Sequence, residues 1–385
     1  MRWTTLLGAL ALGATALPVA AQVAARPDSS AKPQQISADV LFWTQEQRDA
    51  NFPHMETLFS GHVVHASPHP RLFLRGRPLP LVESDIDAFM DGQNVAGLIV
   101  VQDGRIRLER YKRGYSRFGR WTSFSVAKSV TSTLLGAAIL DGYIKSVKDP
   151  VTRYIPELVG SAYDGVTIAQ LLTMTSGVKW NEDYADPKSD LAQILVHPAP
   201  AGTDPTVAYL RTLPREAAPG GKWVYKTGES NLVGVLVARA THRTLADYLT
   251  QKVWKKYGME RDAFWLSDSS GQDIGGCCLS ASLRDYARFG QVVLEGGAGI
   301  VPDGWFDDAT RPHVPFADGA GYGYHWWTYP EGRFGAVGIF GQNILVDPKH
   351  HIVIAMSADW PKASDPELSA QRAAFEAKVI EAGLK

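Results

Sequence analysis

A serine and a lysine three residues apart form the pair with the clearest chemical potential in this sequence. Ser125 and Lys128 stand at the start of a mostly apolar stretch that predicts a helix over residues 125–141. Residues three apart on a helix share a face, so the hydroxyl and the amine can meet. A neutral amine beside a serine can take the hydroxyl proton and leave the oxygen nucleophilic. This S-x-x-K spacing is typical of serine enzymes that attack acyl groups.

The pattern is short, so its context decides its meaning. The same spacing occurs at residues 29–32, in a Pro/Ser/Ala-rich stretch, and at residues 176–179, across a Ser-Gly turn. Ser125 and Lys128 alone open an expected helix of useful length. The alternative interpretation is a capped, buried helix that carries an incidental lysine.

Composition limits the class of protein. The chain has 385 residues, 45% of them hydrophobic and 21% charged, which is ordinary for a globular protein. A net charge of −1 gives no reason to expect nucleic acid or anionic lipid as a partner.

The first 21 residues predict an export signal. Arg2 precedes an apolar stretch over residues 6–17, and Val19-Ala20-Ala21 fits a small-residue cleavage site. Residues 22–36 follow as a linker rich in Ala, Pro, Ser and Gln. We therefore expect a periplasmic or secreted protein with no membrane contact after signal removal, and an uncleaved anchor remains the alternative.

The only cysteines, Cys277 and Cys278, are neighbours. Adjacent Cα atoms lie about 3.8 Å apart, below the usual disulfide span of about 4.4–6.8 Å. A bridge between them would be strained, although an oxidising compartment would permit it. The sequence favours two buried thiols and leaves the bridge open.

The order of expected elements predicts the fold class. Strands are expected at residues 96–102 and 105–111 around an Asp-Gly turn, and again near the C-terminus, at 322–329, 334–339, 342–346 and 351–357. Helices are expected at 125–141, from residue 282 and at 366–383. This pattern predicts an α+β fold, an antiparallel sheet flanked by helices with an inserted, mostly helical region.

The same pattern divides the chain. We expect an irregular N-terminal extension at 37–80, a sheet domain formed by 81–141 and 270–385, and a mostly helical domain at 142–269. The extension carries four closely spaced histidines, His54, His62, His65 and His69. No metal-ligand motif accompanies them, so no metal site is expected and a zinc hydrolase is disfavoured.

Four segments in this order resemble the serine β-lactamase and penicillin-binding-protein family, in its class C branch. They are the nucleophile motif at 125–128 and the stretches at 147–158, 171–178 and 275–290. The segments at 181–187 and 340–342 are similar to the subgroup typified by 6-aminohexanoate-dimer hydrolase, which is also an esterase.

Two family motifs depart from the usual pattern. The Tyr-x-Asn motif is matched by Tyr225, but Thr227 stands in place of the asparagine. Residues 336–339, Ala-Val-Gly-Ile, stand where Lys-Thr-Gly is usual. The lost groups normally bind a substrate carboxylate, so the resemblance implies acyl compounds without that anchor.

The resemblance implies a role for each matched residue. Ser125 is the expected nucleophile, Lys128 its base and Tyr225 the proton relay to the leaving group. The backbone N–H groups of Ser125 and Ile339 would form the oxyanion hole. The expected substrate-binding residues are Tyr184, Trp180, Trp327 and Gly338.

The predicted function is hydrolysis of small amides or esters through a covalent acyl-enzyme, without a cofactor, and a homodimer is left open. One alternative is a DD-peptidase or β-lactamase, against which the missing Lys-Thr-Gly argues. A second is a non-catalytic penicillin-binding-like envelope protein, which the joint retention of Ser125, Lys128 and Tyr225 disfavours.

Overall fold

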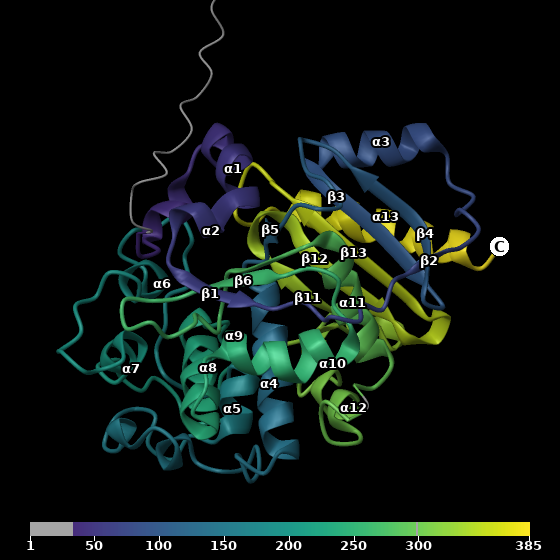
Figure 1. The fold of residues 1–385 in the computed structure, drawn as a ribbon. Coiled ribbons are helices and arrows are strands. Elements are labelled where there is room, and N and C mark those ends of the chain that lie inside the picture. The colour runs from purple at the N-terminus through teal and green to yellow at the C-terminus, as the bar shows by residue number, and fades with distance from the viewer. Residues whose placement is uncertain (1–33, 298) are drawn as a thin grey trace, which may run out of the picture. The chain divides into compact units, whose positions relative to one another are not determined.

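The computed structural model describes residues 34–297 and 299–385. The predicted signal peptide, 1–21, and most of the predicted linker, 22–36, lie outside these residues. Two β-sheets and a group of helices make up the described part of the chain (Figure 1).

The larger sheet joins strands from both ends of the chain, as predicted. Its order is β2-β4-β3-β13-β12-β11-β10-β9-β8, and every neighbouring pair is antiparallel except β2 and β4. Along this order the strands are Leu74–Arg75, Arg105–Tyr111, Val95–Gln102, Ile352–Ala358, Gln342–Asp347, Phe334–Gly338, Trp327–Thr328, Gly321–Tyr322 and Val314–Pro315.

Both faces of the central strands are buried. In β3, Leu98 and Val100 belong to one hydrophobic cluster, whereas Ile99 and Val101 belong to another on the opposite face. Side chains alternate along a strand, so a near-continuous apolar run serves two cores at once.

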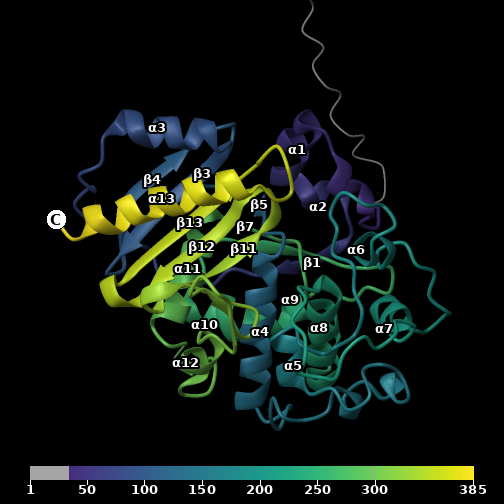
Figure 2. The same ribbon diagram turned by 180° about the vertical axis from the view of Figure 1, so that it is seen from behind.

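Helices cover both faces of this sheet (Figures 1 and 2). On one face lie α3 (Glu83–Gly92) and α13 (Pro366–Gly383), where the rings of Phe89 and Phe375 stack with centroids 3.8 Å apart. On the other lie α11 (Leu283–Leu294) and α4 (Val126–Leu140). Helices 125–141 and 366–383 and the one near 282 were all predicted.

A second sheet, of four strands, was not predicted. Its order is β1-β6-β7-β5, with strands Gly61–Val64, Ala263–Leu266, Leu279–Ala281 and Trp121–Thr122. Each strand is short, and two of them come from stretches without clear alternation.

The expectation of an irregular N-terminal extension at 37–80 is wrong in part. It contains α1 (Gln45–Asn51), α2 (Met55–Leu58), β1 and β2. The start of α1 carries a capping box, in which the Thr44 and Gln47 side chains bond each other's backbone N–H. This signal was present in the sequence as T-x-x-Q.

The remaining helices lie mostly between residues 142 and 310. They are α5 (Ile168–Leu172), α6 (Asp190–Gln193), α7 (Pro205–Leu210), α8 (Thr227–Thr241), α9 (Leu245–Leu249), α10 (Lys255–Tyr257) and α12 (Trp305–Ala309). Single helical turns are η1 (Ala38–Phe42), η2 (Phe52–His54), η3 (Val151–Arg153), η4 (Pro156–Leu158), η6 (Pro330–Gly332), η7 (Ile339–Gly341) and η8 (Pro348–His350), and η5 (Thr250–Trp254) is a π-helical turn.

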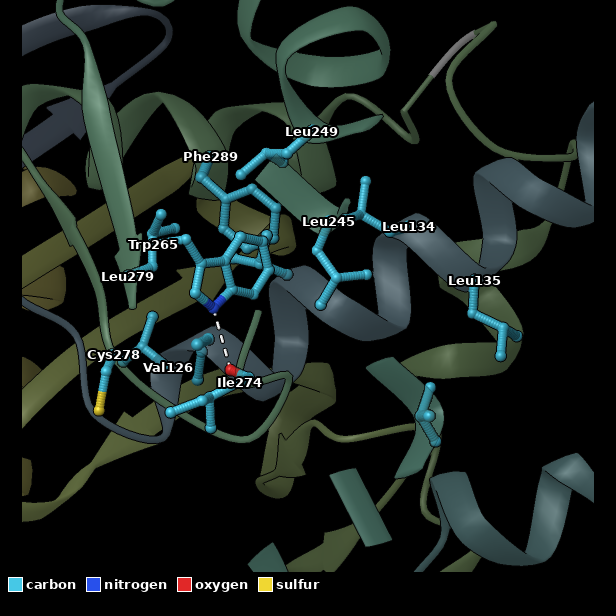
Figure 3. Close-up of a cluster of buried hydrophobic side chains, with 14 of the residues drawn as sticks. Val126, Leu134, Leu135, Leu245, Leu249, Trp265, Ile274, Cys278, Leu279 and Phe289 are labelled. Atoms are coloured by element: carbon cyan, nitrogen blue, oxygen red, sulfur yellow. Dashed lines mark hydrogen bonds between the residues drawn. The ribbon is translucent and has the colours of Figure 1, made fainter. Parts of the chain in front are cut away.

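Trp265 anchors the core beside α4 (Figure 3). Its ring is fully buried, and its Nε1 donates to the carbonyl of Ile274 at 2.9 Å. Leu134 on α4 and Leu245 on α9 belong to the same core. This contact fixes the segment around Gly276, which reaches the candidate site described below.

None of the helices that the structure describes combines the length and the apolar character needed to span a bilayer.

Candidate active site

Ser125 lies at the N-terminus of α4, and its hydroxyl does not cap the helix. It is the N-cap residue, yet its side chain makes no capping hydrogen bond. The residue before it, Phe124, has a φ of 42°, a conformation that non-glycine residues rarely adopt. The helix N-terminus adds positive potential at the Ser125 oxygen.

Lys128 meets Ser125, as the spacing predicted. The fully buried Lys128 Nζ donates to Ser125 Oγ at 2.9 Å, to Thr227 Oγ1 at 2.9 Å and to the Gly276 carbonyl at 2.8 Å. Burial lowers the pKa of Lys128 from 10.5 to about 8, and the nearby charge of Glu182 opposes that change. A useful fraction of the amine is therefore neutral near neutral pH and able to accept a proton.

Tyr225 stands over the amine. Its ring centroid is 5.1 Å from Lys128 Nζ, and the ring stacks on Trp327 at 5.8 Å. Burial first, and the Glu182 charge second, raise the pKa of Tyr225, while a hydrogen bond to Ser125 lowers it. Tyr225 is therefore a protonated donor at neutral pH, and Lys128 is the group that loses its proton more readily.

Glu182 is a site residue that sequence reasoning missed. It accepts hydrogen bonds from the Thr227 backbone N–H at 2.8 Å, the Thr227 hydroxyl and Trp180 Nε1. The Tyr184 hydroxyl donates to it at 3.3 Å. Burial raises the pKa of Glu182, and the charge of Lys128 opposes that change. Its only signal in the sequence was its place within the 181–187 segment.

Glu182→Gln is expected to shift the acid limb of kcat/KM to lower pH. Glutamine keeps the size and one acceptor oxygen but removes the charge that raises the pKa of Lys128. The measurement is a pH profile of p-nitrophenyl ester hydrolysis. Glu83→Gln is the control, because Glu83 is exposed and pairs with Arg110. A Glu182→Gln midpoint equal to that of the wild type would contradict the electrostatic link.

Gly338 and Ile339 bring the end of β11 against the nucleophile segment. A Cβ on Gly338 would lie 2.5 Å from the Ser123 carbonyl oxygen, so only glycine allows this approach. Ile339, the next residue, lines the space around Ser125. The expected oxyanion-hole residues, Ser125 and Ile339, are therefore brought together.

Two cavities meet at Ser125, Tyr184 and Ile339. The first, called the apolar pocket, has about 540 Å³ of empty space, counted together with the open solvent at its mouth, and includes Phe124, Leu191, Ile274 and Thr227 in its lining. The second, called the aromatic groove, has about 770 Å³ and includes Glu182, Tyr225, Trp327, Gly338, Trp360 and Arg372. The site is thus asymmetric, because among the described lining residues charged side chains occur only in the aromatic groove.

Three of the four predicted substrate-binding residues line one or both cavities, and the fourth lines neither. Tyr184 borders both cavities, and Trp327 and Gly338 line the aromatic groove. Trp180 lines neither of the two. Its side chain is buried, packs on Gly228 and holds Glu182 through Nε1. Trp180 therefore positions Glu182 without lining either cavity.

Cys277 and Cys278 form a disulfide, so the expectation of two thiols is wrong. Their Cα atoms are 3.7 Å apart. Cys278 has a φ of 74°, and both residues line the apolar pocket. The bridge follows Gly276 directly, so it lies next to the carbonyl that accepts from Lys128.

Comparison with known sequences identifies the family. The β-lactamase family model matches residues 82–378. The 6-aminohexanoate-dimer hydrolase of Paenarthrobacter ureafaciens is 30% identical over 327 residues, 78% of this chain and 80% of that protein. A β-lactamase of Pseudomonas fluorescens is 26% identical over 192 residues, 47% of this chain and 49% of that one.

Solved structures share the fold. A Bacillus anthracis protein provisionally described as a 6-aminohexanoate-dimer hydrolase superposes with a TM-score of 0.75 at 21% identity, covering 86% of this chain and 93% of that one. A mutant class C β-lactamase superposes with a TM-score of 0.58 at 16% identity, covering 80% and 99%. The predicted α+β class is confirmed, and the chain belongs to the β-lactamase family of serine hydrolases.

Proposed function

We propose that this serine hydrolase cleaves small amides or esters through a covalent acyl-enzyme on Ser125. The observation that carries the proposal is the 2.9 Å contact between Ser125 Oγ and Lys128 Nζ, together with a pKa of Lys128 of about 8. A buried amine of lowered pKa beside a hydroxyl is the arrangement that activates a serine.

The first half-reaction forms the acyl-enzyme. Ser125 Oγ attacks the substrate carbonyl carbon while Lys128 accepts the hydroxyl proton. The backbone N–H groups of Ser125 and Ile339 stabilise the oxyanion, an effect of about 10²–10³ in rate for each donor. Tyr225 gives its proton to the departing nitrogen or oxygen and takes up the proton that Lys128 had accepted, so Lys128 is neutral again. The carbonyl–leaving-group bond breaks, and an ester to Ser125 remains.

The second half-reaction hydrolyses the acyl-enzyme and regenerates the free enzyme. A water molecule attacks the acyl carbon and gives a proton to neutral Lys128. The bond to Ser125 Oγ then breaks, and that oxygen takes the proton back from Lys128. The products are the carboxylic acid and the amine or alcohol. No cofactor takes part in this scheme.

The substrate class follows from the changed motifs and from the relatives. Ala336 and Val337 replace the lysine and threonine that bind a substrate carboxylate, and Val337 lines the aromatic groove. This favours open-chain amides or esters, in line with the relative named for the 6-aminohexanoate dimer. A DD-peptidase or β-lactamase activity is the second candidate, because β-lactamases also match, and nitrocefin turnover would reveal it.

A fluorophosphonate probe tests the covalent step. We expect labelling of the native protein at Ser125, located by peptide mass spectrometry, together with p-nitrophenyl ester hydrolysis that the probe abolishes. Heat-denatured protein is the control and should stay unlabelled. Hydrolysis that survives complete labelling, or a label on another residue, would refute the proposal. The absence of both labelling and hydrolysis would refute it too, and would favour a non-catalytic binding protein.

Two predictions concern the setting of this activity. The predicted export signal at residues 1–21 favours a periplasmic or secreted location, which cell fractionation would check. A homodimer stays a prediction, and one related structure is described as octameric. Size-exclusion chromatography with light scattering would decide between these states.

A further inference from the structure

The apolar pocket is free of charge, unlike the aromatic groove. Its polar lining comes from hydroxyl and amide side chains, such as Thr227 and Asn231, and no charged residue is among the described residues that line it. The groove contains Glu182 and Arg372. A charged group placed in the pocket would lose its hydration without a partner, which is costly.

The proposed function indicates which part of the substrate each cavity would bind. Tyr225, the proton donor to the leaving group, lines the aromatic groove and not the apolar pocket. The leaving group therefore occupies the groove. The carbonyl substituent on the other side of the scissile bond must extend past Ser125 toward the pocket. This step rests on the proposed function.

One wall of the pocket comes from the start of the N-terminal extension and from the last residue of the predicted linker. Ile36, Ser37, Val40 and Leu41 line it, and Val40 is only 3% exposed. These residues lie before the stretch 82–378 that matches the family model. The wall is therefore built from residues outside the matched part of the chain.

This wall is held in place at both ends. At its start, the Gln34 N–H donates to the Leu58 carbonyl at 2.9 Å, and the Gln34 carbonyl accepts from Ser60 at 2.8 Å. After its end, Arg48 on α1 forms a buried ion pair with Asp359 at 2.7 Å. Two anchors this close in sequence make the wall a fixed boundary of the pocket.

The extension also supports the nucleophile segment. Phe52 is fully buried and contacts the rings of Phe124 and Phe340, with centroids 5.0 and 5.4 Å away. Both partners have a positive φ and adjoin Ser125 and Ile339, respectively. The same extension thus packs behind the nucleophile and bounds the space beside it.

We propose that the apolar pocket binds the acyl chain of the substrate, and that Ile36, Val40 and Leu41 set the length of uncharged chain that it accepts. Burial of each added methylene in an apolar site raises kcat/KM roughly fourfold until the chain meets the wall. An acyl chain ending in a charged ammonium group is disfavoured relative to an alkyl chain of equal length.

A series of p-nitrophenyl esters from acetate to octanoate tests this proposal. In the wild type, kcat/KM should rise with chain length and then level off or fall. The 6-aminohexanoate ester should react at least tenfold more slowly than the heptanoate ester, which has a chain of equal length. Equal rates for these two esters would overturn the proposal.

Substitutions in the wall test whether these residues limit the length of the acyl chain. Val40→Trp fills the pocket and should lower the ratio of hexanoate to acetate kcat/KM at least tenfold. Val159→Trp is the matched control, because Val159 is 61% exposed and outside the pocket lining, and it should keep the wild-type ratio. An unchanged ratio in folded Val40→Trp would overturn the proposal.

A second variant covers the case in which tryptophan prevents folding. Val40→Ala enlarges the pocket and should move the best substrate to a longer chain, and an unmoved optimum would count against the wall. Failure of the proposed function would look different, because the wild type would then hydrolyse none of these esters, acetate included.

Discussion

Ser125→Ala is expected to lower kcat for p-nitrophenyl ester hydrolysis by at least about 10³-fold, to near the background rate. The change removes the side-chain oxygen to which Lys128 Nζ donates within the proposed nucleophile motif. A covalent acyl-enzyme needs a nucleophilic oxygen at the position of Ser125 Oγ. The side chains of Lys128, Tyr225 and Thr227 cannot supply it there. Steady-state kinetics with active-site titration would measure the loss.

The fold should tolerate this change. The Ser125 side chain makes no capping bond, and Lys128 keeps Thr227 Oγ1 and the Gly276 carbonyl as acceptors. We expect a stability loss of about 1 kcal/mol or less. Ser132→Ala on the same helix is the control, since the buried Ser132 hydroxyl has no hydrogen-bond partner among the described residues. Near wild-type activity in Ser125→Ala would refute the nucleophile assignment.

Lys128→Met is expected to reduce kcat/KM by about 10²–10⁴-fold, the usual contribution of a general base. Methionine matches the length of the buried stem but cannot accept a proton. The acid limb, whose midpoint should lie near pH 8 in the wild type, should disappear. A variant profile that still shows this limb would assign the titration to another group.

The same substitution has a second readout in stability. The pKa of Lys128 is about 8 in the folded protein, against 10.5 for a free lysine, so the unfolded state binds the proton more tightly. Below pH 8 this difference costs the folded state about 3 kcal/mol, and the cost disappears as pH rises toward 10.5. The function of this lysine is therefore obtained at the expense of stability.

Denaturant unfolding of both proteins would show this effect. The stability of the wild type minus that of Lys128→Met should increase by about 3 kcal/mol between pH 7 and pH 10.5. Hydrogen bonds lost in the variant change the offset and leave this slope in place. Lys145→Met, at an exposed lysine, is the control for the loss of a lysine charge by the same substitution. A flat difference for Lys128→Met would mean that the lysine is charged in the fold.

Local patterns in the sequence were sufficient for much of the fold. The hairpin of β3 and β4 follows from an Asp-Gly turn between apolar runs, and α13 begins and ends where its pattern does. The second sheet was missed because its strands have two to four residues each, and because β1 with β6 and β5 with β7 pair across more than 150 residues of sequence, as Trp121 does with Ala281. Pairs so distant leave no periodic signal.

The sequence by itself determined the contact between Ser125 and Lys128, because three residues of helix place both side chains on one face. Only the tertiary structure decided that Glu182 and Thr227 surround this pair, since they join it from a loop and from the start of α8. It also decided that the N-terminal extension bounds the apolar pocket. The physical reason is that helical spacing acts over a few residues, whereas burial, charge and cavity shape depend on segments that meet only after folding.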